Sequence, residues 1–164
     1  MPEAPLTADP VREEVLRAAA DGLSPEAARL LPALYAALPV TELAARPPEA
    51  LREAAASLAA LAQKRAPGEV KLRLTPPASG RGAHGVAEII ADDMPFLVDS
   101  VLAALTREGR VVREFLHPVL NVTRDAAGGL LALGQGEARE SLMRVTIGAS
   151  AGHLLPGMHP GGWV

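Results

Sequence analysis

Apolar residues recur at helical spacing along the first third of the chain. The pattern predicts three helices, beginning at Asp9, at Ser24 and near Glu49. Asp9 and Ser24 can each accept hydrogen bonds from the free amides of a first turn, and each is followed by a proline, which tolerates that position. Pro32 removes one hydrogen bond from the second helix, so a kink or a break is expected there. Residues 1–68 are interpreted as a helical segment.

From residue 69 the pattern changes to the alternation and the short apolar runs that are typical of β-strands. Pro118 cannot donate a hydrogen bond to a neighbouring strand, so its strand is expected at a sheet edge or with a bulge. A helix that ends at Gly109 is predicted between the second and third strands. In it, Asp93 is expected to cap the first amides and Pro95 to occupy the first turn. Strands are predicted over residues 70–74, 86–90, 110–122, 130–133 and 141–147.

This order of elements predicts an α+β protein. The strand at 86–90, the helix and the next strands make three quarters of a ferredoxin-like βαββαβ unit. We therefore expect the helical segment 1–68, an incomplete βαββ sheet unit over 69–148, and a flexible Gly/Pro-rich tail over 149–164. The missing fourth strand would pair with residues 86–91. An open edge is thus expected there, available either to a second copy of the chain or to the tail folding back.

Composition excludes several classes of function. The chain has 164 residues, of which 49% are hydrophobic and 2% aromatic, so its core must consist mainly of Ala, Leu and Val. The net charge is −3 and there is no basic run, which argues against nucleic acid and against a membrane surface as partners. The absence of cysteine excludes disulfides and thiolate chemistry. No signal peptide and no membrane-spanning run are recognisable, so a cytoplasmic location is expected.

Residues with catalytic chemistry are few and scattered. A nucleophile would have to be Ser100 or Ser141, and neither lies in a nucleophile motif or beside an evident base. The spacing of the histidines matches no metal site, so no metal is expected. The run from Gly80 to Gly85 has the form G-x-G-x-x-G, but a predicted strand follows it where the dinucleotide fingerprint needs a helix. We therefore expect no active site, and no bound cofactor, in this chain. The histidines are His84, His117, His153 and His159.

If the chain binds a small ligand, the acidic turn before the helix is the predicted site. The amides at a helix start carry a partial positive charge that favours a small anion such as a carboxylate. His117 is expected across the sheet from this turn, where it could pair with Asp92 or Glu88 or have a purely structural role. The alternative for the aspartates is that they only cap and solvate the turn. The candidate site residues are Asp92, Asp93, Met94, Phe96, Asp99 and His117.

The segment Val86-Ala87-Glu88-Ile89-Ile90-Ala91-Asp92-Asp93-Met94-Pro95-Phe96-Leu97-Val98-Asp99-Ser100-Val101 resembles the N-terminal region of the large bacterial NAD-specific glutamate dehydrogenases. Shorter blocks extend the resemblance from about Leu43 to Ile147. In that family this region precedes the catalytic domain and contains ACT-like modules, a βαββαβ fold that binds amino acids in many metabolic enzymes. The shorter blocks are residues 42–46, 61–69, 116–120 and 140–145.

The resemblance implies a non-catalytic regulatory or assembly segment of an NAD-dependent glutamate dehydrogenase. The parent enzyme would convert L-glutamate to 2-oxoglutarate and ammonium, and NAD would bind to domains absent from this chain. Expected partners are the rest of the dehydrogenase chain or a second copy, with an amino acid as a possible effector. The alternatives are a free-standing ACT-like module that acts on another enzyme and, more remotely, an independent enzyme. The length of the natural reading frame would separate the first two.

Two departures from the family pattern bear on ligand binding. ACT modules that bind amino acids often read Asp-x-Pro-Gly at the turn, whereas this chain has Asp93-Met94-Pro95-Phe96. The Phe96 side chain is expected to crowd the approach of a ligand to the backbone. The second departure is the tail, which turns to Gly and Pro after Ile147 where the family continues with a helix.

Overall fold

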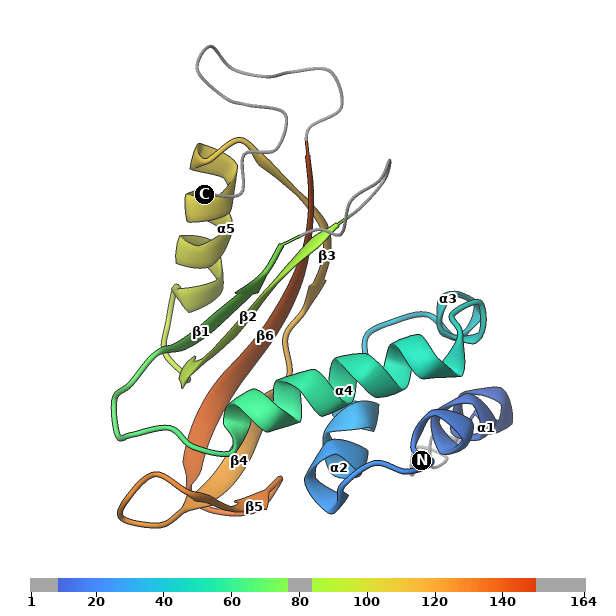
Figure 1. Ribbon diagram of the computed structural model, residues 1–164, viewed down its shortest axis with the longest axis horizontal. Helices are drawn as coiled ribbons and strands as arrows, with labels where there is room; N and C mark the ends of the chain where they lie inside the picture. The colour runs from blue at the N-terminus through green and yellow to red at the C-terminus, as the bar shows by residue number, and fades with distance from the viewer. Residues whose placement is uncertain (1–8, 77–83, 150–164) are drawn as a thin grey trace, which may run out of the picture.

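The computed structural model describes residues 9–76 and 84–149, which form helices and a single antiparallel sheet (Figure 1). The helices are α1 (Pro10–Ala19), α2 (Pro25–Leu34), α3 (Val40–Ala44), α4 (Pro48–Ala62) and α5 (Leu97–Arg107). The strands are β1 (Lys71–Thr75), β2 (Gly85–Asp92), β3 (Arg110–Leu116), β4 (Val119–Arg124), β5 (Leu130–Leu133) and β6 (Ala138–Ala149). The predicted α+β class, with helices first and an antiparallel sheet after them, is confirmed.

The first two helices start where their capping residues predict. Asp9 Oδ1 accepts the amide of Val11 at 2.9 Å, and Ser24 Oγ accepts the amide of Ala27 at 3.2 Å. These bonds satisfy donors that have no partner inside the helix. Pro32 lies inside α2, which ends two residues later at Leu34.

Strand β6 is the central strand of the sheet. The strand order is β1-β2-β6-β4-β5, and β3 also pairs with β6. The N-terminal part of β6 pairs with β4 and its C-terminal part with β3. The single strand predicted over 110–122 is therefore wrong, because His117 and Pro118 separate two strands. A proline cannot donate to the ladder, so the chain leaves the strand conformation at that point.

The expectation of an open edge along residues 86–91 is also wrong. Strand β1 pairs antiparallel with β2, with Lys71 opposite Ile90 and Thr75 opposite Val86. It thus occupies the place that the fourth strand takes in a ferredoxin-like unit, and Ile90 is fully buried. The alternative was that the tail folds back onto this edge. Residues 150–164, which form the tail, lie outside the described residues.

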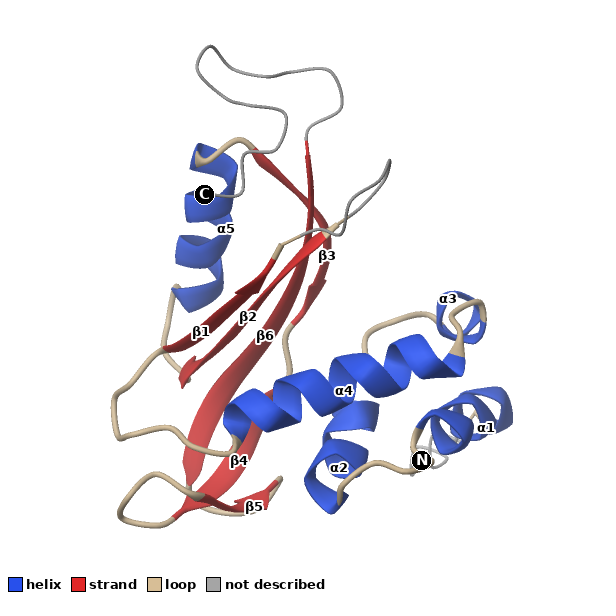
Figure 2. Ribbon diagram, viewed as in Figure 1, coloured by secondary structure: helices blue, strands red, loops and turns tan. Residues whose placement is uncertain are grey.

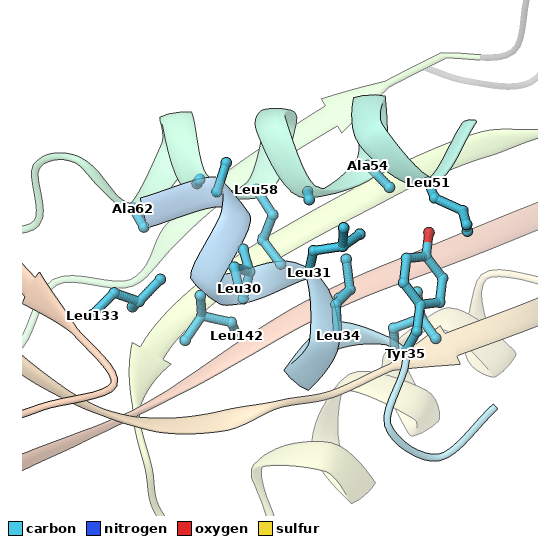
Figure 3. Packing of buried hydrophobic residues seen from close by; sticks show 14 of the residues in the cluster. Leu30, Leu31, Leu34, Tyr35, Leu51, Ala54, Leu58, Ala62, Leu133 and Leu142 are labelled. Atoms are coloured by element: carbon cyan, nitrogen blue, oxygen red, sulfur yellow. The ribbon is translucent and has the colours of Figure 1, made fainter. Parts of the chain in front are cut away.

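One face of the sheet, which we call the helical face, carries α2 and α4, and α1 packs on α3 and α4 beside them (Figure 2). Its core joins α2 and α4 to the sheet through side chains that are almost completely buried, including Leu30, Leu58 and Leu142 (Figure 3). Burial of each such leucine stabilises the fold by about 1.5–3 kcal/mol. The helices and the sheet therefore share one core.

The opposite face, which we call the α5 face, is covered less completely. A small cluster of Ala87, Val145 and Ile147 packs with partly buried residues of α5 and β3, among them Leu105. No residue of α5 is fully buried. In the described part of the chain, no helix is long and apolar enough to cross a membrane.

The start of α5 differs from the prediction, although its end does not. The helix begins at Leu97 with Phe96 as the N-cap residue, so Asp93 does not cap it and Pro95 lies before its first turn. At the other end, Gly109 follows the helix with φ of 72°, the left-handed conformation that glycine adopts readily.

Candidate functional site

One buried serine, Ser141, links the turn between β2 and α5 to the short segment between β3 and β4. Ser141 Oγ lies 3.1 Å from Asp93 Oδ1 and 3.0 Å from His117 Nε2. Ser141 reaches both because it stands on β6 between Ala91 of β2 and Val119 of β4, on the α5 face. Two of the predicted site residues, Asp93 and His117, are thus brought together, although sequence analysis gave Ser141 no part in joining them.

The chemistry of the three groups fixes the direction of these hydrogen bonds. An ionised carboxylate only accepts, so the Ser141 hydroxyl donates to Asp93. The hydroxyl oxygen then accepts from His117, which must carry its proton on Nε2. Burial lowers the pKa of His117 below its usual 6.5, and the nearby Asp93 carboxylate offsets only part of that shift. His117 is therefore a neutral imidazole at pH 7, with a lone pair on Nδ1.

A hollow of about 320 Å³ lies beside His117. It is formed where the end of α2 and the following turn approach the junction of β3 and β4. Its lining is apolar apart from His117. The ring of Phe115 meets the His117 ring edge-on, with centroids 5.9 Å apart, and helps to hold it in place. The lining residues are Ala33, Leu34, Ala36, Ala37 and the run 115–120.

Phe96 has an unusual backbone conformation at this turn. Its φ of 65° is in the left-handed region, and no other described non-glycine residue has a positive φ. This conformation costs an L-residue about 1–2 kcal/mol. The side chain is 78% exposed, and the neighbouring Met94 is 48% exposed. The side chain of Phe96 thus lies mostly in solvent, and the crowding of a ligand by it stays a prediction.

The other candidate residues lie apart from this serine. Asp92 forms an ion pair with Arg65, on the far side of the sheet from His117. Asp99 is exposed in the first turn of α5. The predicted pairing of His117 with Asp92 or Glu88 is wrong, because even-numbered residues of β2 point to the helical face while His117 contacts Ser141 on the α5 face.

Two buried carboxylates on the helical face were not predicted as a feature of the site. Glu140 is 2% exposed and contacts Arg65 at 3.1 Å and Arg124 at 2.8 Å. Burial alone would raise the pKa of Glu140, but the hydrogen bonds from Arg124 and Arg65 lower it below its usual 4.5. The only sequence signal was a glutamate beside the apolar run of a predicted strand.

Glu88 is held in the same way. It is 1% exposed and contacts Arg73 of β1 at 3.0 Å and Arg144 of β6 at 2.8 Å. Ser57 of α4 donates a further hydrogen bond to it at 2.9 Å. Such clusters fix neighbouring elements because removal of one partner leaves a buried charge unpaired. We interpret both as structural links between the helical segment and the sheet.

This arrangement does not support catalysis by Ser141. In a serine nucleophile's triad the histidine stands between serine and acid, so that it can take the hydroxyl proton. Here the serine stands between the other two and donates its proton to Asp93, and it is 0% exposed. Residues 9–76 and 84–149 also contain no group of three or more His, Asp or Glu side chains that could hold a metal ion. In the G-x-G-x-x-G run, Gly85 begins β2, so a strand does follow it.

Comparison with known proteins gives a consistent result. Residues 30–153 match the family described as glutamate dehydrogenase, ACT1 domain. The chain is 33% identical over 123 residues to an NAD-specific glutamate dehydrogenase of Halomonas elongata, covering 69% of this chain. It is 37% identical over 82 residues to an NAD-specific glutamate dehydrogenase of Pseudomonas aeruginosa, covering 45% of this chain.

The matched segment is a small part of these relatives. It spans 8% of the Halomonas protein and 5% of the Pseudomonas protein. No solved structure matches the chain significantly.

Proposed function

The chain belongs to the family of the glutamate dehydrogenase ACT1 domain, and we propose that it acts as a non-catalytic regulatory and assembly segment of an NAD-dependent glutamate dehydrogenase. The parent reaction is the oxidative deamination of L-glutamate to 2-oxoglutarate with NAD. Catalysis and NAD binding belong to other parts of that enzyme, which we place in the cytoplasm.

One observation carries this proposal. The family match includes the complete sheet with α4 and α5, yet the matched segment makes up only 8% of the Halomonas relative. A folded unit that makes up so small a part of a dehydrogenase can regulate or assemble the enzyme without taking part in the chemical step. The buried position of Ser141 and its hydrogen bond to Asp93 agree with such a role, because they do not activate Ser141 as a nucleophile.

The proposal is tested in the full-length dehydrogenase that contains this sequence. Deletion of residues 9–149 is expected to change the subunit assembly, or the response of the rate to added amino acids, while NADH still binds. Unchanged assembly together with an unchanged amino-acid response would contradict the proposal. The isolated chain is expected to make no NADH from L-glutamate and NAD, and production above a heat-killed control would also count against it.

A second candidate function is the binding of an amino-acid effector at the turn after β2. The observation in its favour is the Asp93–Ser141–His117 chain, which joins a carboxylate at the turn to an imidazole acceptor, and of these three residues His117 lines the apolar hollow. Asp93 and the lone pair on His117 Nδ1 suit an ammonium group, whereas the free amides at the start of α5 suit a carboxylate.

Calorimetric titration with L-amino acids, L-glutamate first among them, tests this second function. Phe96→Gly removes the side chain beside the amides and is expected to strengthen binding, while Ser141→Ala breaks the link between Asp93 and His117 and is expected to weaken it. The effector hypothesis fails if no amino acid binds to the parent chain and Phe96→Gly does not change that result.

A further inference from the structure

Strand β1 is the outermost strand on one side of the described sheet. It pairs with β2 along one edge, and the strand order places no other described strand on its outer side. The outer amides and carbonyls of an edge strand are free to bind another strand. This is a property of the edge itself and does not depend on the proposed function.

The side chains of β1 leave this edge unprotected. Proteins usually protect edge strands with outward charges, prolines or bulges. The pairing of β1 with β2 is regular from Lys71 to Thr75, without a bulge. Its two apolar side chains are exposed, Leu72 at 58% and Leu74 at 60%, and Val70 before the strand is 57% exposed. These three residues form what we call the β1 strip, which lies on the α5 face because Leu72 stands opposite Ile89.

Helix α5 leaves the β1 strip uncovered. Helix α5 contacts β3, and its Leu105 packs against the cluster of Ala87, Val145 and Ile147. The exposed part of the α5 face is thus the β1 strip itself, since Ile89, which stands opposite Leu72, is buried. Of the seven large hydrophobic side chains that are exposed among the described residues, three belong to the β1 strip.

The charges of β1 point away from the β1 strip, but they weaken pairing with a second copy. Lys71 and Arg73 alternate with the leucines and point to the helical face, where Arg73 contacts Glu88 at 3.0 Å and Lys71 lies 3.6 Å from Glu69. Glu88 also takes an ion pair from Arg144, so its single negative charge is shared by two arginines and offsets the charge of Arg73 only in part. A pairing that places Arg73 of two copies opposite each other is therefore opposed by their like charges, which lie on the helical face and away from the β1 strip.

We propose that β1 of one chain pairs antiparallel with β1 of a second copy, about a twofold axis that passes by Arg73. This register places Leu72 of each chain opposite Leu74 of the other, so that the two β1 strips form one apolar surface. The two sheets then continue into each other, and Lys71 lies opposite Thr75 on the helical face.

The area of this contact predicts its strength. A five-residue edge with the β1 strip offers roughly 500 Å² per chain, so a dimer would bury about 1,000 Å², the lower bound for a specific interface. We therefore expect a weak dimer that forms in the micromolar range and exchanges rapidly.

Sedimentation velocity between 5 and 500 µM tests the association. The mass is expected to rise with concentration from the 17.0 kDa of the monomer toward twice that value. Leu72→Glu is expected to weaken association at least tenfold without unfolding the chain, because the side chain is already largely exposed. The matched control is Leu131→Glu, which introduces the same charge at a leucine of β5 that is 63% exposed and is expected to have no effect.

The register has its own test, because the chain contains no cysteine. Leu72→Cys and Leu74→Cys chains are oxidised alone and as a mixture. Residues opposite each other in antiparallel strands have Cα atoms about 4.5–5.5 Å apart, within reach of a disulfide, whereas the diagonal pairs are too distant. The mixed disulfide between the two variants is therefore expected to exceed either homodimer at least fivefold.

A monomer at every concentration would overturn the proposal, as would association that Leu72→Glu leaves intact. Equal yields of the three disulfides would overturn the register. None of these outcomes bears on the regulatory role proposed above, which concerns the full-length dehydrogenase.

Discussion

The two faces of the sheet differ in how completely this chain covers them. On the helical face, α2 and α4 bury a continuous core, and the carboxylates of Glu88 and Glu140 are each held by two arginines. On the α5 face the core is small, no residue of α5 is itself fully buried, and large apolar side chains such as Leu72 and Phe96 remain exposed.

This difference indicates which face stabilises the fold and which is available for recognition. A buried charge cluster and a leucine core are complete within one chain, so the helical face needs no partner. An exposed apolar edge and an aromatic residue in a costly backbone conformation are not stabilising by themselves. We infer that the helical face holds the domain together and that the α5 face with the β1 edge makes its contacts.

The largest expected effect is on the helical face. Glu140→Ala leaves the guanidinium groups of Arg65 and Arg124 buried without their carboxylate, which is expected to cost about 3–5 kcal/mol of unfolding free energy. Asp92→Ala is the matched control, because Asp92 contacts the same Arg65 but is 54% exposed, and its loss is expected to cost at most about 1 kcal/mol. Urea denaturation measures both. Equal costs would contradict the structural role of the Glu140 cluster.

The next effect compares one leucine from each face. Leu58→Ala creates a cavity in the fully buried core and is expected to cost about 2–4 kcal/mol. Leu74→Ala removes a side chain that is 60% exposed and is expected to change stability by less than about 0.5 kcal/mol at low protein concentration. Thermal unfolding of dilute samples gives the comparison. A Leu74→Ala chain as unstable as Leu58→Ala would show that the β1 strip is already covered within one chain.

A smaller effect, of opposite sign, is expected at Phe96. Glycine adopts a positive φ without strain, so Phe96→Gly is expected to stabilise the chain by up to about 1 kcal/mol, even after the greater backbone freedom of glycine in the unfolded state is counted. Phe96→Ala keeps the strain and is the control. If the alanine variant were the more stable of the two, the left-handed conformation of Phe96 would not be a cost.

The smallest effect is a pH dependence that originates at His117. Its pKa is lowered in the folded state, so the unfolded chain takes up the proton first as the pH falls through 6.5. The stability that neutral His117 contributes is present above pH 6.5 and decreases as the pH falls toward the lowered pKa. The urea midpoint of the parent is therefore expected to drop between pH 7.5 and 5.5 by more than that of His117→Gln. Glu140 does not interfere in this window, because its pKa lies below 4.5. A parent chain that gained stability relative to His117→Gln on acidification would refute this sign.

Sequence analysis predicted the features that local patterns determine. The caps at Asp9 and Ser24 and the position of Gly109 depend on residues within one or two helical turns, and the structure confirms them. Alternation likewise located the strands on either side of the turn. The order of the predicted elements already indicated a ferredoxin-like sheet unit, and the resemblance to the glutamate dehydrogenases implied the same fold.

The features that were missed depend on residues far apart in the sequence. Strand β1 was located, but its pairing with β2 was not, because alternation does not identify a partner. Ser141 joins Asp93 and His117 across 48 and 24 residues, and no local signal gives those distances. At Phe96 the local signal misled, since the Asp93 and Pro95 pattern favoured a helix start two to three residues too early.

The most direct test of the difference between the two faces is hydroxyl-radical footprinting of the chain at low and at high concentration. At 5 µM we predict strong labelling of Leu72, Leu74 and Phe96 and almost none of Leu30, Leu58 or Leu142. At 500 µM the labelling of Leu72 and Leu74 is predicted to fall severalfold while that of Leu131 stays constant. Labelling of the helical-face leucines as strong as that of the β1 strip, or a β1 strip equally labelled at both concentrations, would contradict the account.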